Sequence, residues 1–189
     1  GVKDCVQKAI EVVPETEKTA SCDCDVAAFE EDRTKKITIY PTPSDTGGKT
    51  IYLGEPMVYF HMTMIAAQPG WLCLGKIYES DGSIKNEFKK YRNWWIPAGQ
   101  VFLSTSDICC DLRLFRNPAD TAGTIGYYEG RTMPVLSCSG KWVKLQGKAI
   151  KGKTDTTGWV PFEVMCMNIF TNCCQEIPKK YRYKNHFEK

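Results

Sequence analysis

The chain has no hydrophobic run near the roughly 18 residues that a membrane-spanning helix requires. It also carries little net charge: the formal value is +3 and the pI about 8.3, below the value of about 9 that is common in nucleic-acid-binding domains. Aromatic residues are plentiful at 12%, which excludes general disorder. The 189 residues therefore predict one folded domain or two small ones, with no membrane span and no nucleic-acid partner.

The small net charge hides an uneven distribution. Residues 1–110 sum to −3, whereas residues 111–189 sum to +6. Such basic stretches are typical of solvated surface, and the alternative is a site for an anionic partner such as an acidic glycan or a lipid headgroup. The basic residues concerned are Lys141, Lys144, Lys148, Lys151 and Lys153, and in the tail Lys179, Lys180, Arg182 and Lys184.

Histidine is scarce and cysteine is not. Metal sites usually combine Cys pairs two to four residues apart with a second pair or with histidines, but His61 and His186 are isolated and no cysteine spacing fits. We therefore expect no metal and no cofactor. Ten cysteines, an even number, indicate an exported disulfide-bonded protein. The disulfide candidates are Cys5, Cys22, Cys24, Cys73, Cys109, Cys110, Cys138, Cys166, Cys173 and Cys174.

These cysteines predict a periplasmic or extracellular location. Residues 1–20 contain no signal-peptide core, and the start at Gly1 is interpreted as a mature chain whose signal peptide has been removed. A lipid anchor upstream of residue 1 stays open. Adjacent side chains on a strand point to opposite faces, so Cys109 and Cys110 are expected to bond two different partners and to fix the relative orientation of the two halves of the chain.

The chain contains an internal duplication. Trp95-Ile96-Pro97 recurs as Trp159-Val160-Pro161, and each tryptophan is followed 14 residues later by an adjacent cysteine pair. Upstream, residues 39–46 match residues 114–121, and Trp71 matches Trp142. The landmarks keep their order in both copies, so we interpret the sequence as a tandem repeat. The first copy has a longer polar loop near residues 79–87.

Alternating patterns and turn residues divide each copy into short strands. Val2–Val13 has helical spacing and ends at Pro14, which predicts a short N-terminal helix. The predicted division is residues 1–34 as an N-terminal segment with this helix, 35–110 and 111–174 as the two repeats, and 175–189 as a basic tail. Strands are expected at 36–40, 57–65, 71–77, 99–104, 112–115, 131–137, 142–145 and 158–167.

The second copy resembles bacterial SH3-like domains. The resemblance lies in Leu112–Asp120, Gly130–Leu136, the Gly-Lys-Trp142 strand and the closing Gly158-Trp159-Val-Pro strand. The first copy matches less well, because Asn93-Trp94-Trp95 replaces the Gly-Trp step. The resemblance implies a mainly β fold of two tandem SH3-like small β-barrels behind the N-terminal helical segment. It also implies modules that bind cell-wall peptides or glycans.

Catalytic patterns are missing. His61 lies in an apolar run and His186 in the tail, and no free thiolate is indicated where cysteines are paired. Gly47-Gly48-Lys49-Thr50 lacks the first glycine of a phosphate-binding loop. The adjacent carboxylates of residues 30–32 cannot converge on one bond. We therefore expect no enzyme.

Aromatic side chains are the better candidates for a binding surface, because a flat ring suits a proline-rich peptide or a sugar. Each candidate could equally serve packing, and Trp95 and Trp159 are expected in the core. The ligand-binding candidates are Phe115, Tyr127, Tyr128 and Trp142 in the second copy, and Tyr40, Tyr52, Trp71 and Trp94 in the first.

The sequence thus predicts a non-catalytic exported binding module that recognises cell-wall peptidoglycan or its peptides. The alternative is a periplasmic scaffold that docks a protein partner, its own grooves filled by the chain and the N-terminal segment as occupant. A third interpretation is an enzyme with a site between the barrels.

Overall fold

The structure is a computed structural model that describes residues 19–27, 36–52, 60–79, 82, 84, 86–103, 110–119, 121–129, 133–151, 154–164 and 177–185. These residues form antiparallel strands with three short 3-10 helices and no α-helix. The mainly β fold is therefore confirmed, while the helix expected at residues 2–13 lies outside the described residues. No helix in the described part of the chain is long and apolar enough to cross a bilayer.

The first half begins with a strand inside the segment that the sequence left unassigned. This strand, β1, pairs with β4 over most of its length. The elements of this half are β1 (Ala20–Ala27), β2 (Lys36–Ile39), β3 (Lys49–Tyr52), β4 (Phe60–Gln68), β5 (Trp71–Glu79), η1 (Asn86–Tyr91), β6 (Trp95–Pro97) and β7 (Phe102–Leu103).

The second half repeats the strand succession and adds one strand from the C-terminal tail. Its elements are β8 (Cys110–Phe115), β9 (Thr124–Glu129), β10 (Met133–Ser139), β11 (Trp142–Ala149), β12 (Asp155–Pro161), η2 (Phe162–Val164), η4 (Lys179–Tyr181) and β13 (Arg182–Asn185).

Most strands belong to one continuous ladder. Its order is β12-β8-β9-β11-β10-β7-β1-β4-β5-β6, with β13 added to β8 and with β12 also paired to β11. The β2–β3 hairpin stands apart and reaches β6 through a bridge between Tyr40 and Trp95. Within the described strands β12 meets β8 at the pair Trp159–Phe115, and no closed barrel is identified.

The two halves share the same strand register around their tryptophans. Trp71 lies opposite Pro97 and Cys73 opposite Trp95. In the second half Trp142 lies opposite Pro161, and Lys144 opposite Trp159. The preceding hairpins also agree, because Gln68 faces Trp71 and Ser139 faces Trp142 across two-residue turns.

Each of these turns contains a glycine with positive φ, Gly70 at 77° and Gly140 at 54°. Glycine adopts this left-handed conformation without the steric cost that a Cβ would add. The paired positions that the duplication predicts therefore occupy matching places in the two halves.

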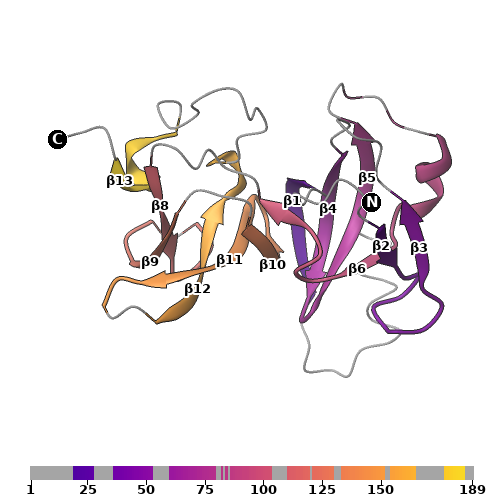
Figure 1. Ribbon diagram of the computed structural model, residues 1–189, viewed down its shortest axis with the longest axis horizontal. Helices are drawn as coiled ribbons and strands as arrows, with labels where there is room; N and C mark the ends of the chain where they lie inside the picture. The colour runs from indigo at the N-terminus through magenta and orange to yellow at the C-terminus, as the bar shows by residue number, and fades with distance from the viewer. Residues whose placement is uncertain are drawn as a thin grey trace.

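A seam between β1 and β10 joins the halves, and both strands lie between the two lobes in Figure 1. Cys22 of β1 is disulfide-bonded to Cys138 of β10. Beside it, the Asp23 N–H donates to the Gly140 carbonyl at 2.8 Å, and the Gly140 N–H donates to the Ser21 carbonyl at 2.7 Å. One hydrophobic core runs through both halves, so the two repeats form one body.

The disulfide at the seam differs from the one expected at the junction of the repeats. Cys73 is also disulfide-bonded. Cys24, a disulfide candidate, instead has a buried thiol whose Sγ donates to the Gly140 carbonyl at 3.0 Å. Of the other candidates, Cys5, Cys109, Cys166, Cys173 and Cys174 lie outside the described residues, and Cys110 is described by its backbone alone.

Candidate functional site: a cleft between the two halves

The aromatic candidates of the second half divide between the core and a covered face. Phe115 and Tyr128 are 0% and 1% exposed, and the ring of Phe115 is covered in part by Tyr181 of the tail. Trp142 is half-buried and packs edge-on against Phe115, with ring centroids 5.9 Å apart. Tyr127 is half-buried as well and stacks on Tyr183 of the tail at 4.7 Å.

The candidates of the first half lie in two separate places. Tyr40 and Trp71 form one edge-to-face pair, with centroids 5.3 Å apart. Trp94 packs edge-on against Tyr91, also at 5.3 Å. Tyr52 is 51% exposed and lines a hollow of about 320 Å³ together with Tyr91. The eight predicted residues thus do not converge on one site.

A larger cleft opens where the two halves meet, with a volume of about 520 Å³. Its floor and walls come from the β4–β5 turn of the first half and from β10, β11 and β12 of the second. The lining residues that matter below are Gln68 and Pro69 on one side, and Ser137, Lys144, Thr157 and Trp159 on the other.

Lys144 and Trp159 give this cleft a cationic and an aromatic surface. They are opposite each other on β11 and β12, and the Lys144 Nζ lies 5.9 Å from the centroid of the Trp159 ring. Both side chains are half-buried. The expectation that Trp159 belongs to the core is therefore wrong, whereas Trp95 is fully buried as expected.

Gln68 adds an unsatisfied polar group. Its side chain is 5% exposed, and its Oε1 has no hydrogen-bond partner among the described residues. A buried amide oxygen without a donor costs on the order of 1–3 kcal/mol.

The shared register shows that the same face is closed in the first half. Lys144 and Trp159 correspond to Cys73 and Trp95, which are both fully buried and pack with Ala66 in a small core of their own. A cation and a half-exposed ring in the second half replace two buried side chains. This replacement makes the face accessible in the second half alone.

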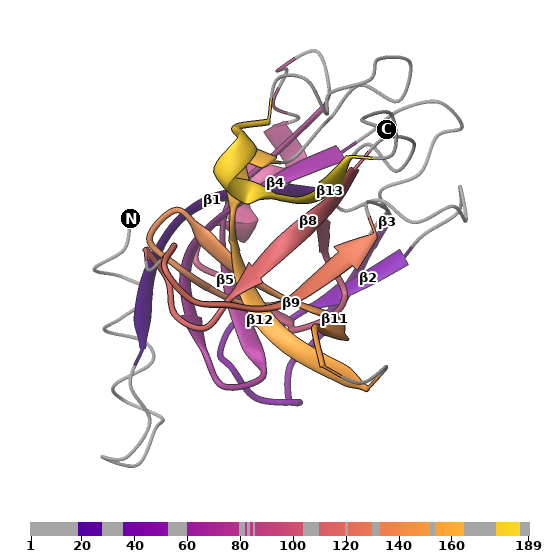
Figure 2. The same ribbon diagram turned by 90° about the vertical axis from the view of Figure 1, so that its left-hand side faces the viewer.

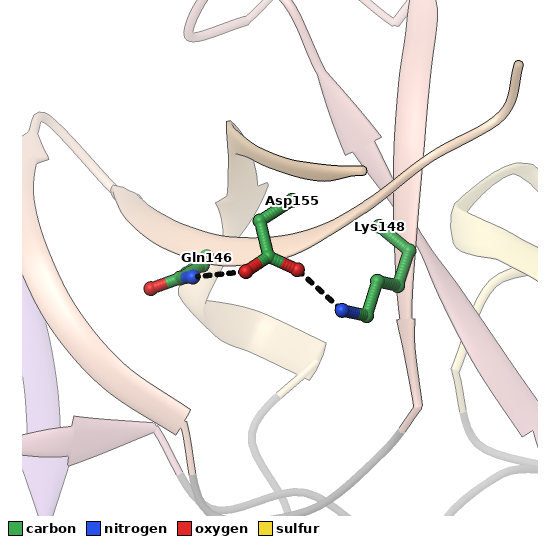
Figure 3. A network of polar contacts seen from close by, with 3 residues as sticks. All are labelled: Gln146, Lys148 and Asp155. Atoms are coloured by element: carbon green, nitrogen blue, oxygen red, sulfur yellow. Dashed lines mark hydrogen bonds and ion pairs between the residues drawn. The ribbon is translucent and has the colours of Figure 1, made fainter. Parts of the chain in front are cut away.

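Among the described residues that line the cleft Lys144 is the only charged one, so they give the cleft a positive charge. Lys148, four residues beyond Lys144 on β11, is different: it forms an ion pair with Asp155, which also accepts a hydrogen bond from Gln146 Nε2 at 3.2 Å (Figure 3). The hydrogen bond and charge of Lys148 lower the pKa of Asp155. Of the basic stretch that the sequence shows, Lys144 is therefore the member that faces the cleft.

The described residues contain no arrangement typical of acid–base or metal chemistry. No group of three or more His, Cys, Asp or Glu side chains among them could hold a metal ion. His61 is buried near the opposite end of β4 from Gln68, and burial lowers the pKa of its imidazole, which keeps the ring neutral at pH 7. The cleft itself is lined by a cation, an aromatic face, hydroxyl groups and an amide side chain.

The sequence contains two signals that bear on this cleft. Lys144 belongs to a basic stretch that is typical of solvated surface or of a site for an anionic partner, and the apolar residues after Trp159 predict a core position. The alignment of the two copies pairs Trp159 with Trp95, but periodicity alone does not show that one face is covered and the other open.

Comparison with known proteins adds no assignment: no protein-family model matches the chain, and neither the curated proteins nor the solved structures contain a significant match.

Proposed function

We propose that the protein is an exported, non-catalytic binding module of two SH3-like β units, with its ligand site in the cleft between the halves. The observation that carries this proposal is the opening of the Lys144–Trp159 face, which is closed at Cys73 and Trp95 in the first half. Disulfides at Cys22–Cys138 and at Cys73 support an oxidising compartment. The repeated register supports the tandem arrangement.

The lining chemistry favours a ligand with a carboxylate, amide or hydroxyl donors and a flat apolar part. Lys144 would pair with the carboxylate and the hydroxyls of Ser137 and Thr157 would bond to the polar groups, while Trp159 would pack on the ring or chain of the ligand. Cell-wall peptidoglycan combines these groups, because its peptides carry carboxylates and amides beside sugar rings. We therefore propose a cell-wall peptide or glycan as the ligand.

The test is co-sedimentation of the purified protein with insoluble peptidoglycan, at low salt and at about 0.3 M salt to screen exposed charges. We expect retention at both salt concentrations and a loss of about ten-fold or more in Trp159→Ala and in Lys144→Gln. Lys141→Gln removes an exposed lysine in the nearby turn and serves as the matched control. Equal retention of all four proteins would contradict the cleft as the site.

A second candidate function is a periplasmic scaffold that docks a protein partner. It is favoured by a specific observation: side chains of the tail, Tyr181 and Tyr183, pack on the aromatic residues Trp142 and Tyr127 of the second half. The chain thus fills one of its own aromatic faces, with the C-terminal tail as occupant. Absence of any peptidoglycan retention by the wild-type protein would favour this candidate.

A further inference from the structure

The C-terminal segment, residues 177–185, is an added strand on the second half. β13 runs antiparallel to β8, with Arg182 opposite Leu112 and Lys184 opposite Asp111. Figure 2 shows this segment in yellow along β8, at the side of the lobe. The strand of the first half that corresponds to β8 is β2. Among the described strands β2 pairs with β3 alone, so the first half shows no counterpart of β13 there.

Two tyrosines of this segment occupy the aromatic face that the sequence singled out. Tyr181 is 5% exposed and packs edge-on against Phe115 at 6.1 Å and Trp142 at 6.3 Å. Two residues later, Tyr183 stacks in parallel on Tyr127, with an angle of 4° between the rings. We call Phe115, Tyr127, Trp142 and the adjoining edge of β8 the tail groove.

The polar contacts of the tail groove are of a kind that many extended peptides could make. The Arg113 Nε donates to the backbone carbonyl of Arg182 at 2.6 Å, and the strand pairing also uses backbone groups. Neither contact depends on the side chain of the bound residue, so selectivity must come from the aromatic positions and from charge.

Two acidic residues are related to the basic residues of the segment by strand register and by charge. Lys184 lies opposite Asp111 on the neighbouring strand. The pKa of Lys180 is raised, first by its hydrogen bond to Tyr181 and by the charge of that phenol, and further by the charge of Glu163 in η2. On one flank of the tyrosine pair the backbone register thus places Lys184 opposite an aspartate, and on the other the charge of Glu163 acts on Lys180.

The segment is attached in a way that permits release. β13 has four residues, and its register shifts between Arg182 and Lys184. Pro178, Lys179, Lys180 and Tyr183 are exposed, while Ile177 and Tyr181 are buried. A short edge strand with two buried anchors opens locally at a lower free energy than the whole fold requires.

We propose that the tail groove is a binding surface for an extended peptide of a protein partner. This peptide carries two aromatic side chains at positions i and i+2 between basic residues. Residues 177–185 are the intramolecular occupant of the tail groove. The partner pairs with β8 as an added strand and places its aromatic side chains where Tyr181 and Tyr183 lie. Because the tail is tethered at an effective concentration in the millimolar range, the partner competes with it for the same surface.

The test uses a fluorescein-labelled peptide with the sequence of residues 177–185, titrated with the full-length protein and followed by fluorescence anisotropy. We expect weak binding to the wild type and binding at least ten-fold tighter to Tyr181→Ala/Tyr183→Ser, whose own tail competes poorly. A peptide with serine at both tyrosine positions should bind neither protein. Equal affinity of the labelled peptide for wild type and variant, or equal binding of the serine peptide, would overturn the proposal.

Three further variants separate the tail groove from folding defects and from the cleft. Tyr183→Ser removes a single exposed ring and leaves Tyr181 in place, so this variant should keep the fold. It should bind the labelled peptide about three-fold tighter than the wild type does. If this folded variant bound the peptide no tighter than the wild type, the result would count against the proposal. Tyr52→Ser, which removes an exposed tyrosine of the first half, and Lys144→Gln in the cleft should both bind as wild type does. A loss of peptide binding in Lys144→Gln would place the peptide in the cleft instead.

Discussion

The disulfide at the seam should contribute a large share of the stability of the fold. Cys22 and Cys138 are 116 residues apart, and closing a loop of that length in the unfolded chain corresponds to about 4.9 kcal/mol at 25 °C in the chain-entropy description. Cys73 inside this loop is itself disulfide-bonded, and a second cross-link reduces the entropy that the first one removes, so we expect Cys22→Ala/Cys138→Ala to lose about 3–4 kcal/mol. In a chain of this length such a loss lowers Tm by roughly 10 °C.

The double variant is preferable to a single one, because one remaining thiol could exchange with other disulfides. The assay is urea unfolding followed by tryptophan fluorescence, with thermal unfolding as a second measurement. Cys24→Ala is the matched control: it removes a buried sulfur of the same strand and its hydrogen bond to Gly140, and should cost about 1 kcal/mol. If the double variant lost no more than Cys24→Ala, the reasoning from loop closure would be refuted.

Three further predictions follow from the described geometry. Gly126→Ala should destabilise the fold by about 2 kcal/mol or more, because the added Cβ would lie 2.5 Å from the carbonyl oxygen of Lys148. Gly123→Ala, where the added Cβ meets open space, should be near neutral. Chemical denaturation of both variants measures the two losses of stability, and equal losses would contradict the prediction. The free energy of unfolding should fall as the pH drops through 6.5, because burial lowers the pKa of His61 and the unfolded chain binds a proton that the folded chain does not. His61→Phe should reduce the dependence of this free energy on pH between pH 7 and 5. An unchanged pH dependence would exclude His61 as its source. In Lys148→Gln the pKa of Asp155, measured by NMR titration, should rise towards its ordinary value. The Tm should change little, because the side chains of Lys148 and Asp155 are both exposed. An unaltered titration of Asp155 would refute the ion pair.

Periodicity and turn residues predicted the strands that alternate clearly. In β2 the buried residues Ile37 and Ile39 alternate with less buried ones, as expected for a half-buried strand. The starts of β5 and β11 at Trp71 and Trp142 also agree with the prediction. In contrast, β1 was missed, because Ala20–Ala27 is rich in Cys and Asp and its strand form depends on pairing with β4.

The candidate site was harder to predict because it depends on which faces become covered. Tyr181 and Tyr183 were assigned to a solvated basic tail, although an aromatic residue at every second position is also typical of a strand. Their packing on Trp142 and Tyr127 involves residues about 40 or more positions away, which a local pattern does not reveal. Long-range pairing determines the exposure of Trp159 as well.

The position of β1 has a consequence for how the protein can be made. During synthesis the first half emerges from the ribosome before residue 138, so Cys22 waits for its partner until the start of the second half has been translated. A fragment that ends near residue 110 would lack Gly140, so β1 would lose the backbone hydrogen bonds that it makes with this residue. A fragment that starts near residue 110 would lack β1 altogether. Although the two halves repeat the same strand register, the disulfide at the seam needs a cysteine from each of them, so oxidation at Cys22 can follow only after residue 138 has been made.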